Sequence, residues 1–232
     1  MSEPTPNLVQ QSEDRERWVA TAAGRSPGES MAFRTRFREF VLHALSITLR
    51  LTHPVTRKIR RLCWAAEVRA SVCRMGAGVY VYGPIRFLGS REVWLGGSGN
   101  LYDNVLFETV APARISVGDG FRINRGCLIS AHAGITIGDN CLIGEYVSIR
   151  DNNHVFDDTS VPIGEQGFRA SPITIDDDVW IGRGAAILQG VSIGRGAVIG
   201  ANSVVTKDVP DHEVWAGIPA RFLRHRKKGD SG

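Results

Sequence analysis

A histidine at the end of a regular repeat is the residue of this chain best suited to chemistry. His154 stands in the run S-I-R-D-N-N-H-V-F-D-D, where a periodic aliphatic pattern gives way to polar sequence. An imidazole titrates near neutral pH, so it can take a proton from a hydroxyl group and return it to a leaving group. We therefore interpret His154 as a general base. Spacing does not distinguish among the four acidic residues that could orient it: Asp151, Asp157, Asp158 and Glu145.

Two further groups of residues suit ligand binding. Asn124, in R-I-N-R-G-C-L-I-S, offers an amide thirty residues before His154, although an Asn at a turn also serves purely conformational needs. Lys207, Arg221 and Arg224 suit phosphate groups. The run R-F-L-R-H-R-K-K, to which two of them belong, leaves open an ordinary solvated basic tail.

The element that must position these residues is a repeat of six, from Ile115 to Val205. Aliphatic residues return every six positions, in one run to His154 and in a second run from Ile175. A six-residue period is typical of a parallel β-helix, in which each hexad forms one side of a coil. Its aliphatic residue points inward, and Gly, Asp or Asn takes the corner. The positions of the two runs are Ile137, Ile143, Ile149, and then Ile175, Ile181, Ile187, Ile193, Ile199, Val205.

The repeat is interrupted once, from Arg150 to Pro172. This stretch is polar and irregular, and a loop of this length inside a regular coil is uncommon unless it is functional. We expect residues 150–172 to leave one corner of the helix and to reach over a neighbouring subunit, with His154 at their root.

Composition is consistent with one good-sized domain and a small extra one. The chain has 232 residues, a formal net charge of +4 and 26 glycines. Residues 1–30 are polar, lack a secretory signal and predict a flexible tail. The four cysteines have no metal or disulfide spacing, so we expect no metal site and a cytoplasmic location.

Residues 31–76 predict a basic, amphipathic helical extension with a break at Pro54. The second helix runs from Val55 to Val72, and two interpretations of the extension are compatible: a cap over the first coil, and a surface that rests on the inner face of an anionic membrane through residues 31–74. Its apolar stripe is predicted to be Val55, Ile59, Leu62, Cys63, Ala66 and Ala70.

The segments Val179–Pro210 and Ala216–Arg221 (A-G-I-P-A-R) resemble the hexapeptide-repeat acyltransferases. The likeness covers about Val79 to Arg226 and is greatest to the maltose, galactoside, nodulation-factor and exopolysaccharide O-acetyltransferases. It implies a left-handed parallel β-helix over residues 77–215, a C-terminal cap and basic tail over residues 216–232, a homotrimer with active sites between subunits, and acetyl-CoA as donor. General rules favour right-handed crossovers, so the left hand comes from the resemblance alone.

The resemblance also assigns roles by position. His154 matches the catalytic base and Asn124 an acceptor contact, whereas Ala131 and His132 replace acidic residues of the sugar acetyltransferases. This departure leaves the acceptor open, and His132 could contact it instead. Trp180 matches an aromatic wall of the active site, whose alternative role is packing between subunits. Positions that match CoA contacts are Arg183, Ala201, Thr206, Lys207, Arg221 and Arg224.

The sequence thus predicts an acetyl-CoA-dependent O-acetyltransferase acting on a sugar hydroxyl, as in polysaccharide biosynthesis or on a glycosylated small molecule. N-acylation of an amino-sugar or amine and a non-catalytic trimeric carbohydrate-binding scaffold stay open as alternatives. Serine acetyltransferase fits less well, because its long helical N-terminal domain is not visible. Nucleic-acid binding has no motif to support it. The sequence identifies neither the acceptor nor the length of the acyl group.

Overall fold

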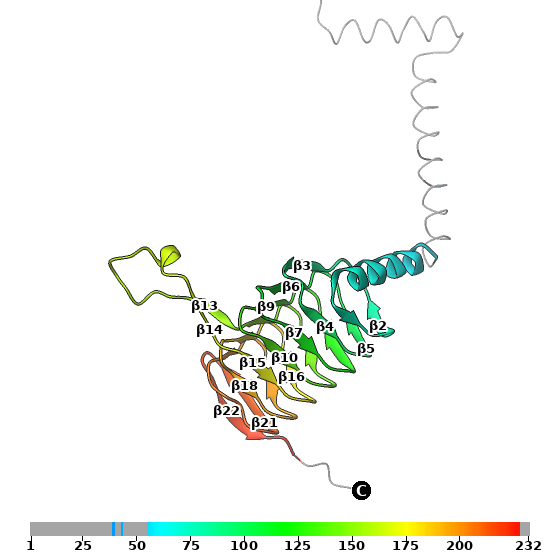
Figure 1. The fold of residues 1–232 in the computed structure, drawn as a ribbon. Helices are drawn as coiled ribbons and strands as arrows, with labels where there is room; N and C mark the ends of the chain where they lie inside the picture. Colours follow the sequence, from blue (N-terminus) through cyan, green and yellow to red (C-terminus); the bar gives the residue numbers. More distant parts are fainter. Residues whose placement is uncertain (1–38, 40–42, 44–54, 228–232) are drawn as a thin grey trace, which may run out of the picture. The chain divides into compact units, whose positions relative to one another are not determined.

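The chain folds into the left-handed parallel β-helix that the family resemblance implies (Figure 1). The computed structural model describes Glu39, His43 and residues 55–227, and it divides the chain into two units, Met1–Lys58 and Ile59–Gly232. All of the described strands lie in the second unit. The predicted tail of residues 1–30, the first predicted helix apart from Glu39 and His43, and the end of the basic tail lie outside the described residues.

Three sheets form the three sides of the solenoid, and each coil adds one strand to each sheet. The first sheet contains β1 (Arg74–Met75), β4 (Val93–Leu95), β7 (Ile115–Val117), β10 (Ile135–Ile137), β15 (Ile173–Ile175) and β18 (Ser192–Ile193). The second contains β2 (Gly78–Val81), β5 (Ser98–Leu101), β8 (Phe121–Ile123), β11 (Leu142–Ile143), β16 (Trp180–Ile181), β19 (Val198–Ile199), β21 (Glu213–Gly217) and β22 (Ala220–His225). The third contains β3 (Arg86–Gly89), β6 (Leu106–Thr109), β9 (Leu128–Ala131), β12 (Ser148–Arg150), β17 (Ala186–Ile187) and β20 (Val204–Val205).

The hexad aliphatic residues form ladders along the axis of the helix. Ile143 pairs with Ile123 on one side and with Ile181 on the other, and all three are buried. Fully burying a side chain of this size contributes about 1.5–3 kcal/mol, so each coil is stabilised mainly by the coils next to it. Cys127 and Cys141 also face the interior, where burial raises the pKa of each thiol to about 11.

Corners of the coil require left-handed backbone, and the sequence supplies residues that tolerate it. Asn140 has φ of 58° and Gly184 has φ of 69°. Asn and Gly adopt this region at lower cost than other residues, so their recurrence between the aliphatic positions places the corners.

A helix over residues 55–71 precedes the first coil, in close agreement with the predicted bounds. The predicted apolar stripe is wrong, because all six of its residues are exposed. The helix instead packs on the core through Trp64, Ala65 and Val68. Of its two apolar stripes, the helix buries the one with the larger apolar surface area, which contains the Trp64 indole. No helix among residues 55–227 is long and apolar enough to cross a membrane.

The excursion leaves the solenoid after β12 and rejoins it at β15, and it projects from the coils in Figure 1. Its base is the antiparallel pair of β13 (Asn152–His154) and β14 (Phe168–Ala170), and its far part contains a single 3-10 turn, η1 (Ile163–Glu165). At the other end of the helix, the stretch predicted to close the last coil forms β22, antiparallel to β21.

Candidate active site

His154 lies at the root of the excursion, with its imidazole exposed. It is the last residue of β13 and pairs with Phe168 across the two-stranded base. The centroids of the two rings are 4.3 Å apart with the planes inclined at 37°, so the imidazole rests against the phenyl ring. The His132 ring lies 5.4 Å from the same phenyl ring. Phe168 therefore contacts both predicted site histidines.

Asp151 fixes the backbone beneath this cluster. Its buried carboxylate accepts hydrogen bonds from the backbone N–H groups of His132, Ala133 and Gly134, at 2.7, 2.8 and 2.7 Å. A carboxylate held by three N–H donors secures the turn that carries His132. The Asn152 amide adds bonds to Ser130 Oγ and to Asp151 Oδ1, at 3.2 and 3.3 Å.

Within residues 55–227, no hydrogen bond or ion pair joins the His154 imidazole to Asp151, Asp157, Asp158 or Glu145. Asp151 holds the turn just described, and Asp157 pairs with Arg169 at 3.0 Å. Asp158 accepts hydrogen bonds from the Ser160 hydroxyl and backbone N–H, which lower the pKa of its carboxyl group. Within residues 55–227 the imidazole has no hydrogen-bond partner, and no group of three His, Cys, Asp or Glu side chains could hold a metal ion.

Asn124 lies at a different corner of the coil, between β8 and β9. Its Nδ2 donates to the carbonyl oxygen of Ile143 in the next coil at 2.9 Å. Asn124 therefore has the conformational role that was considered for it, because its side chain bonds to the backbone of the next coil. Its side-chain carbonyl oxygen accepts no hydrogen bond from the described part of the chain, so one polar atom stays available to a ligand.

Trp180 stands on the outer face of the second sheet. It pairs in register with Leu142, and the two side chains are 53% and 42% exposed. The two side chains form an exposed apolar pair on this face. Arg183 follows at the corner, with its guanidinium 5.8 Å from the centroid of the Tyr146 ring.

The predicted CoA contacts lie on two sides of the solenoid. Arg183 and Ala201 lie in neighbouring coils at the corner that carries Asn124, where the Asn202 N–H donates to the carbonyl oxygen of Arg183 at 2.8 Å. Thr206 and Lys207 follow β20, at the corner from which the excursion leaves. Arg221 and Arg224 are exposed on β22.

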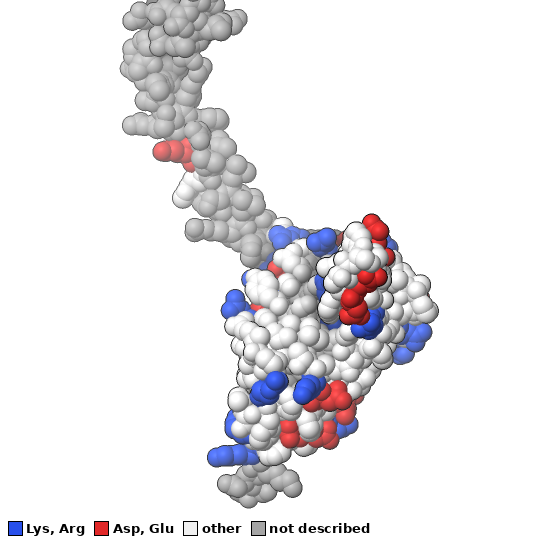
Figure 2. All heavy atoms as spheres, turned by 90° about the vertical axis from the view of Figure 1, so that its left-hand side faces the viewer, with Lys and Arg blue, Asp and Glu red and all other residues white. Residues whose placement is uncertain are grey.

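The predicted cations are free to bind an anion. No carboxylate among residues 55–227 forms an ion pair with Lys207, Arg183, Arg221 or Arg224, although nearby Arg226 and Arg195 are paired with aspartates. On the face seen in Figure 2, Lys and Arg side chains alternate with Asp and Glu and form no continuous basic patch.

The structure thus divides the predicted site residues into two groups, one at the corner that carries the excursion and one on the second sheet and the corner that follows it. The excursion group contains His154, His132, Thr206 and Lys207, and the Asn124 group contains Asn124, Trp180, Arg183, Ala201, Arg221 and Arg224. Phe168 is the residue that sequence reasoning missed. It lies in the irregular stretch, where no period indicates which residues pair, so only the β13–β14 register reveals it.

Two family models match this chain within the solenoid. The model described as bacterial transferase hexapeptide (six repeats) matches residues 172–207, and the model described as hexapeptide repeat of succinyl-transferase matches residues 134–155. These matches confirm the predicted resemblance to the hexapeptide-repeat transferases.

Curated relatives are acetyltransferases that share the repeat region. The chain is 40% identical to galactoside O-acetyltransferase of Escherichia coli over 112 residues, which are 48% of this chain and 54% of that protein. It is 33% identical to the putative lipopolysaccharide biosynthesis O-acetyl transferase WbbJ of Escherichia coli over 113 residues, which are 46% of this chain and 58% of that protein. The matches span about half the length of such relatives.

A solved structure with the same fold is a mutant of AntD, an N-acyltransferase from Bacillus cereus, in complex with dTDP-4-amino-4,6-dideoxyglucose and Coenzyme A. The TM-score is 0.62 at 18% identity, and the match covers 71% of this chain and 89% of that one. At this identity the likeness concerns the fold.

Proposed function

We propose that this chain, which carries the repeats of the hexapeptide-repeat transferases, is an acetyl-CoA-dependent O-acetyltransferase that acts on a hydroxyl of a sugar. The observation that carries the proposal is the exposed His154 imidazole at the root of the excursion, next to His132. The relatives that share the repeats include a galactoside O-acetyltransferase, which supports this class of acceptor.

In the proposed reaction His154 takes the proton of the acceptor hydroxyl while the oxygen attacks the thioester carbonyl carbon of acetyl-CoA. The carbon–sulfur bond then breaks, and the imidazolium gives its proton to the departing thiolate. The acetyl group is already activated as a thioester, so no covalent enzyme intermediate is required. Phe168 supports the imidazole ring from one side and Asp151 fixes the turn beside it.

We propose further that the active site forms between copies of this chain in a homotrimer. The division of the site residues into two groups supports this arrangement, because a closed ring brings one surface of each copy against a different surface of the next. The excursion of one subunit would then cover the Asn124 group of its neighbour. The exposed pair of Leu142 and Trp180 would be covered by that contact.

Acetyl-CoA is proposed to lie along the same boundary. Main-chain groups at Arg183 and Ala201 suit the pantetheine arm, and the unpaired cations Lys207, Arg221 and Arg224 suit the phosphates.

We also propose contact with the inner face of an anionic membrane through residues 31–74. Of these, the described helix exposes Ile59 and Leu62, at 54% and 64%, beside Arg60, Arg61 and Arg69. An exposed apolar stripe with flanking arginines is the pattern of helices that lie on anionic lipid. Flotation with phosphatidylglycerol vesicles should recover the protein, and Leu62→Asp should reduce recovery. Equal recovery with neutral phosphatidylcholine vesicles would contradict an anionic partner.

The experiment that tests the function is release of free CoA thiol from acetyl-CoA in the presence of matched acceptors. Galactose and a 4-amino-4-deoxy sugar separate O-acetylation from N-acylation, and serine tests the third class. The proposal expects turnover with the hydroxyl sugar. Turnover with the amino sugar alone would establish N-acylation instead. The non-catalytic scaffold predicts a different result. The protein would then bind sugars without turnover, and acetyl-CoA would not change its melting temperature.

A further inference from the structure

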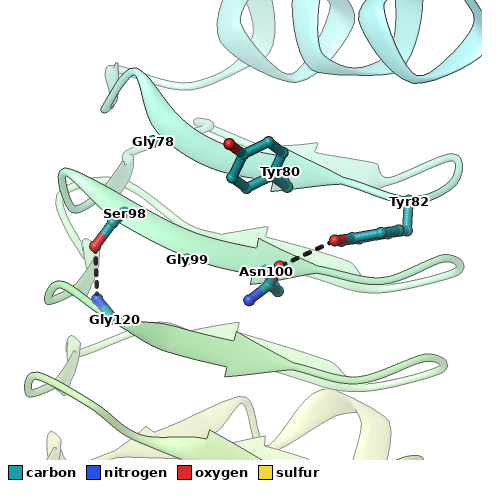
Figure 3. A pocket seen from close by; sticks show the side chains of 7 residues that line it. All are labelled: Gly78, Tyr80, Tyr82, Ser98, Gly99, Asn100 and Gly120. Carbon is teal, nitrogen blue, oxygen red and sulfur yellow. Dashed lines mark hydrogen bonds between the residues drawn. The ribbon is translucent and has the colours of Figure 1, made fainter. Parts of the chain in front are cut away.

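A groove on the outer face of the second sheet lies outside the site residues discussed so far. It has a volume of about 330 Å³ and lies over β2, β5 and the turn before β8 (Figure 3). The outward positions that follow along this sheet hold larger side chains, Arg122, Leu142 and Trp180. The residues that line it are Gly78, Tyr80, Tyr82, Ser98, Gly99, Asn100 and Gly120.

Tyr82 forms a fixed wall of the groove. Its ring stacks on the Tyr102 ring, with centroids 4.8 Å apart and planes inclined at 11°, and the Arg61 guanidinium lies 4.5 Å from its centroid. Its hydroxyl donates to Asn100 Oδ1 at 3.2 Å. Because these contacts already hold the ring, little side-chain freedom is left for a ligand to remove.

Tyr80 provides the open aromatic surface of the groove. Its side chain is 67% exposed, and Figure 3 shows the ring turned face-on, above the neighbouring strand. Such a ring offers a flat apolar face with a polar tip, a combination that is frequent at binding surfaces. No hydrogen bond or ring contact of Tyr80 is made by the described residues.

Polar groups with spare hydrogen-bonding capacity border this aromatic face. The Asn100 carbonyl oxygen accepts from Tyr82, which leaves the Asn100 amide nitrogen free to donate. Ser98 Oγ accepts from the Gly120 N–H at 3.1 Å and keeps its own hydroxyl proton to donate. Neither Lys nor Arg is among the lining residues. A sugar ring, with its apolar C–H face and its rim of hydroxyls, matches a groove of this chemistry.

The register connects the groove to Asn124. The N–H of Tyr82 bonds to Leu101 in the next coil, and the N–H of Tyr102 bonds to Ile123 in the coil after it. Tyr82, Tyr102 and Asn124 therefore occupy equivalent positions in three successive coils. Neighbouring strands lie about 4.8 Å apart, so the backbone of Tyr82 is roughly 10 Å from that of Asn124.

We propose that this groove binds a second sugar unit of an oligosaccharide acceptor whose reacting unit lies at Asn124. This inference rests on the proposed sugar O-acetyltransferase function and specifies its acceptor as a chain of linked sugars rather than a single one. The exposed Tyr80 ring stacks on the sugar, and the Asn100 and Ser98 donors bind its hydroxyls.

The test is saturation-transfer NMR on the full chain with galactose and with β-linked galacto-oligosaccharides of two to four units. The inference expects tighter binding as the second unit is added. Tyr80→Ala should weaken trisaccharide binding about tenfold, which is a loss of about 1.4 kcal/mol, because the stacking surface for the sugar ring is removed. Galactose binding should be unchanged, and Tyr80→Phe should retain trisaccharide affinity. Leu88→Ala, on the outer side of the third sheet and 43% exposed, is the matched control.

Equal affinity of galactose and trisaccharide, or no effect of Tyr80→Ala, overturns the inference. The same holds if Tyr80→Ala changes the sedimentation coefficient or the melting temperature without changing sugar binding, because the groove is then covered by a second copy or by another segment of this chain. Trisaccharide binding that depends on Tyr80, without acetylation of any sugar, supports the groove and contradicts the proposed activity.

Discussion

The excursion group and the Asn124 group differ in how their residues are held. His154 and its neighbour Phe168 are exposed residues of a two-stranded base outside the solenoid, whereas Asn124 and Trp180 belong to coils that are paired on both sides. Asn124 already bonds to the next coil, while the His154 imidazole bonds to nothing among residues 55–227. Under the proposed function, we infer that the rigid group positions a ligand and that the free group meets it once the site is complete.

The largest effect on activity is expected from replacing His154, whose imidazole is free of hydrogen bonds. His154→Ala should lower kcat about 10²–10⁴-fold, the contribution typical of a general base, with little change in acetyl-CoA affinity. Thiol release and a melting-temperature titration with acetyl-CoA measure the two quantities. Phe156→Ala, 63% exposed in the same excursion, controls for disturbance of the loop. Full turnover by the His154 variant would remove the base assignment.

A smaller effect on activity is expected from replacing Asn124, which the coil holds rigidly. Asn124→Ala should raise KM for the sugar about tenfold, as expected when one hydrogen bond worth about 1.4 kcal/mol is lost. The variant also loses the bond to Ile143, so its melting temperature should fall slightly. Asn124→Asp keeps the Oδ1 acceptor and replaces the Nδ2 donor with a second carboxylate oxygen. Recovery of KM in this variant, with the melting temperature still lowered, would separate the ligand contact from the structural one.

Donor affinity should change by a similar or smaller factor. Lys207→Ala should weaken acetyl-CoA about five- to tenfold, because a charge-assisted bond to phosphate contributes about 1–1.5 kcal/mol. Dephospho-CoA as a competitor shows whether the contact is to the 3′-phosphate. The control is Lys227→Ala, in the basic tail beyond β22. An equal loss in the two variants would indicate general attraction rather than a specific contact.

The smallest effects concern stability and contrast the coil with the excursion. At Gly99 a Cβ would lie 2.5 Å from the buried Phe121 ring, so Gly99→Ala should destabilise the protein by about 1–3 kcal/mol through overpacking. At Gly164 an added Cβ meets nothing within 4 Å, so Gly164→Ala should be close to neutral. Denaturant unfolding compares the two. Equal destabilisation would show that the excursion is packed as tightly as the coils.

The same contrast explains what the sequence could predict. The hexad positions, such as Ile143 and Ile181, could be predicted because the same period recurs in coil after coil. A shift of the register by one residue would turn all of these side chains away from the core. The packed face of the helix over residues 55–71 was predicted wrongly, because a single helix offers two apolar stripes and only packing selects Trp64 and Val68. The approach of Phe168 to His154 and His132 depends on a unique loop, which no repeat encodes.

The most direct test of a site shared between copies is complementation of two impaired variants, assayed at a sugar concentration well below KM. His154→Ala and Asn124→Ala subunits are unfolded together, refolded as a mixture and assayed beside each variant refolded alone. If His154 of one subunit acts with Asn124 of the next, random mixing in a closed ring restores about a quarter of the sites. Activity in the mixture well above the mean of the two separate variants is the predicted result. A mixture no more active than that mean would contradict the shared site.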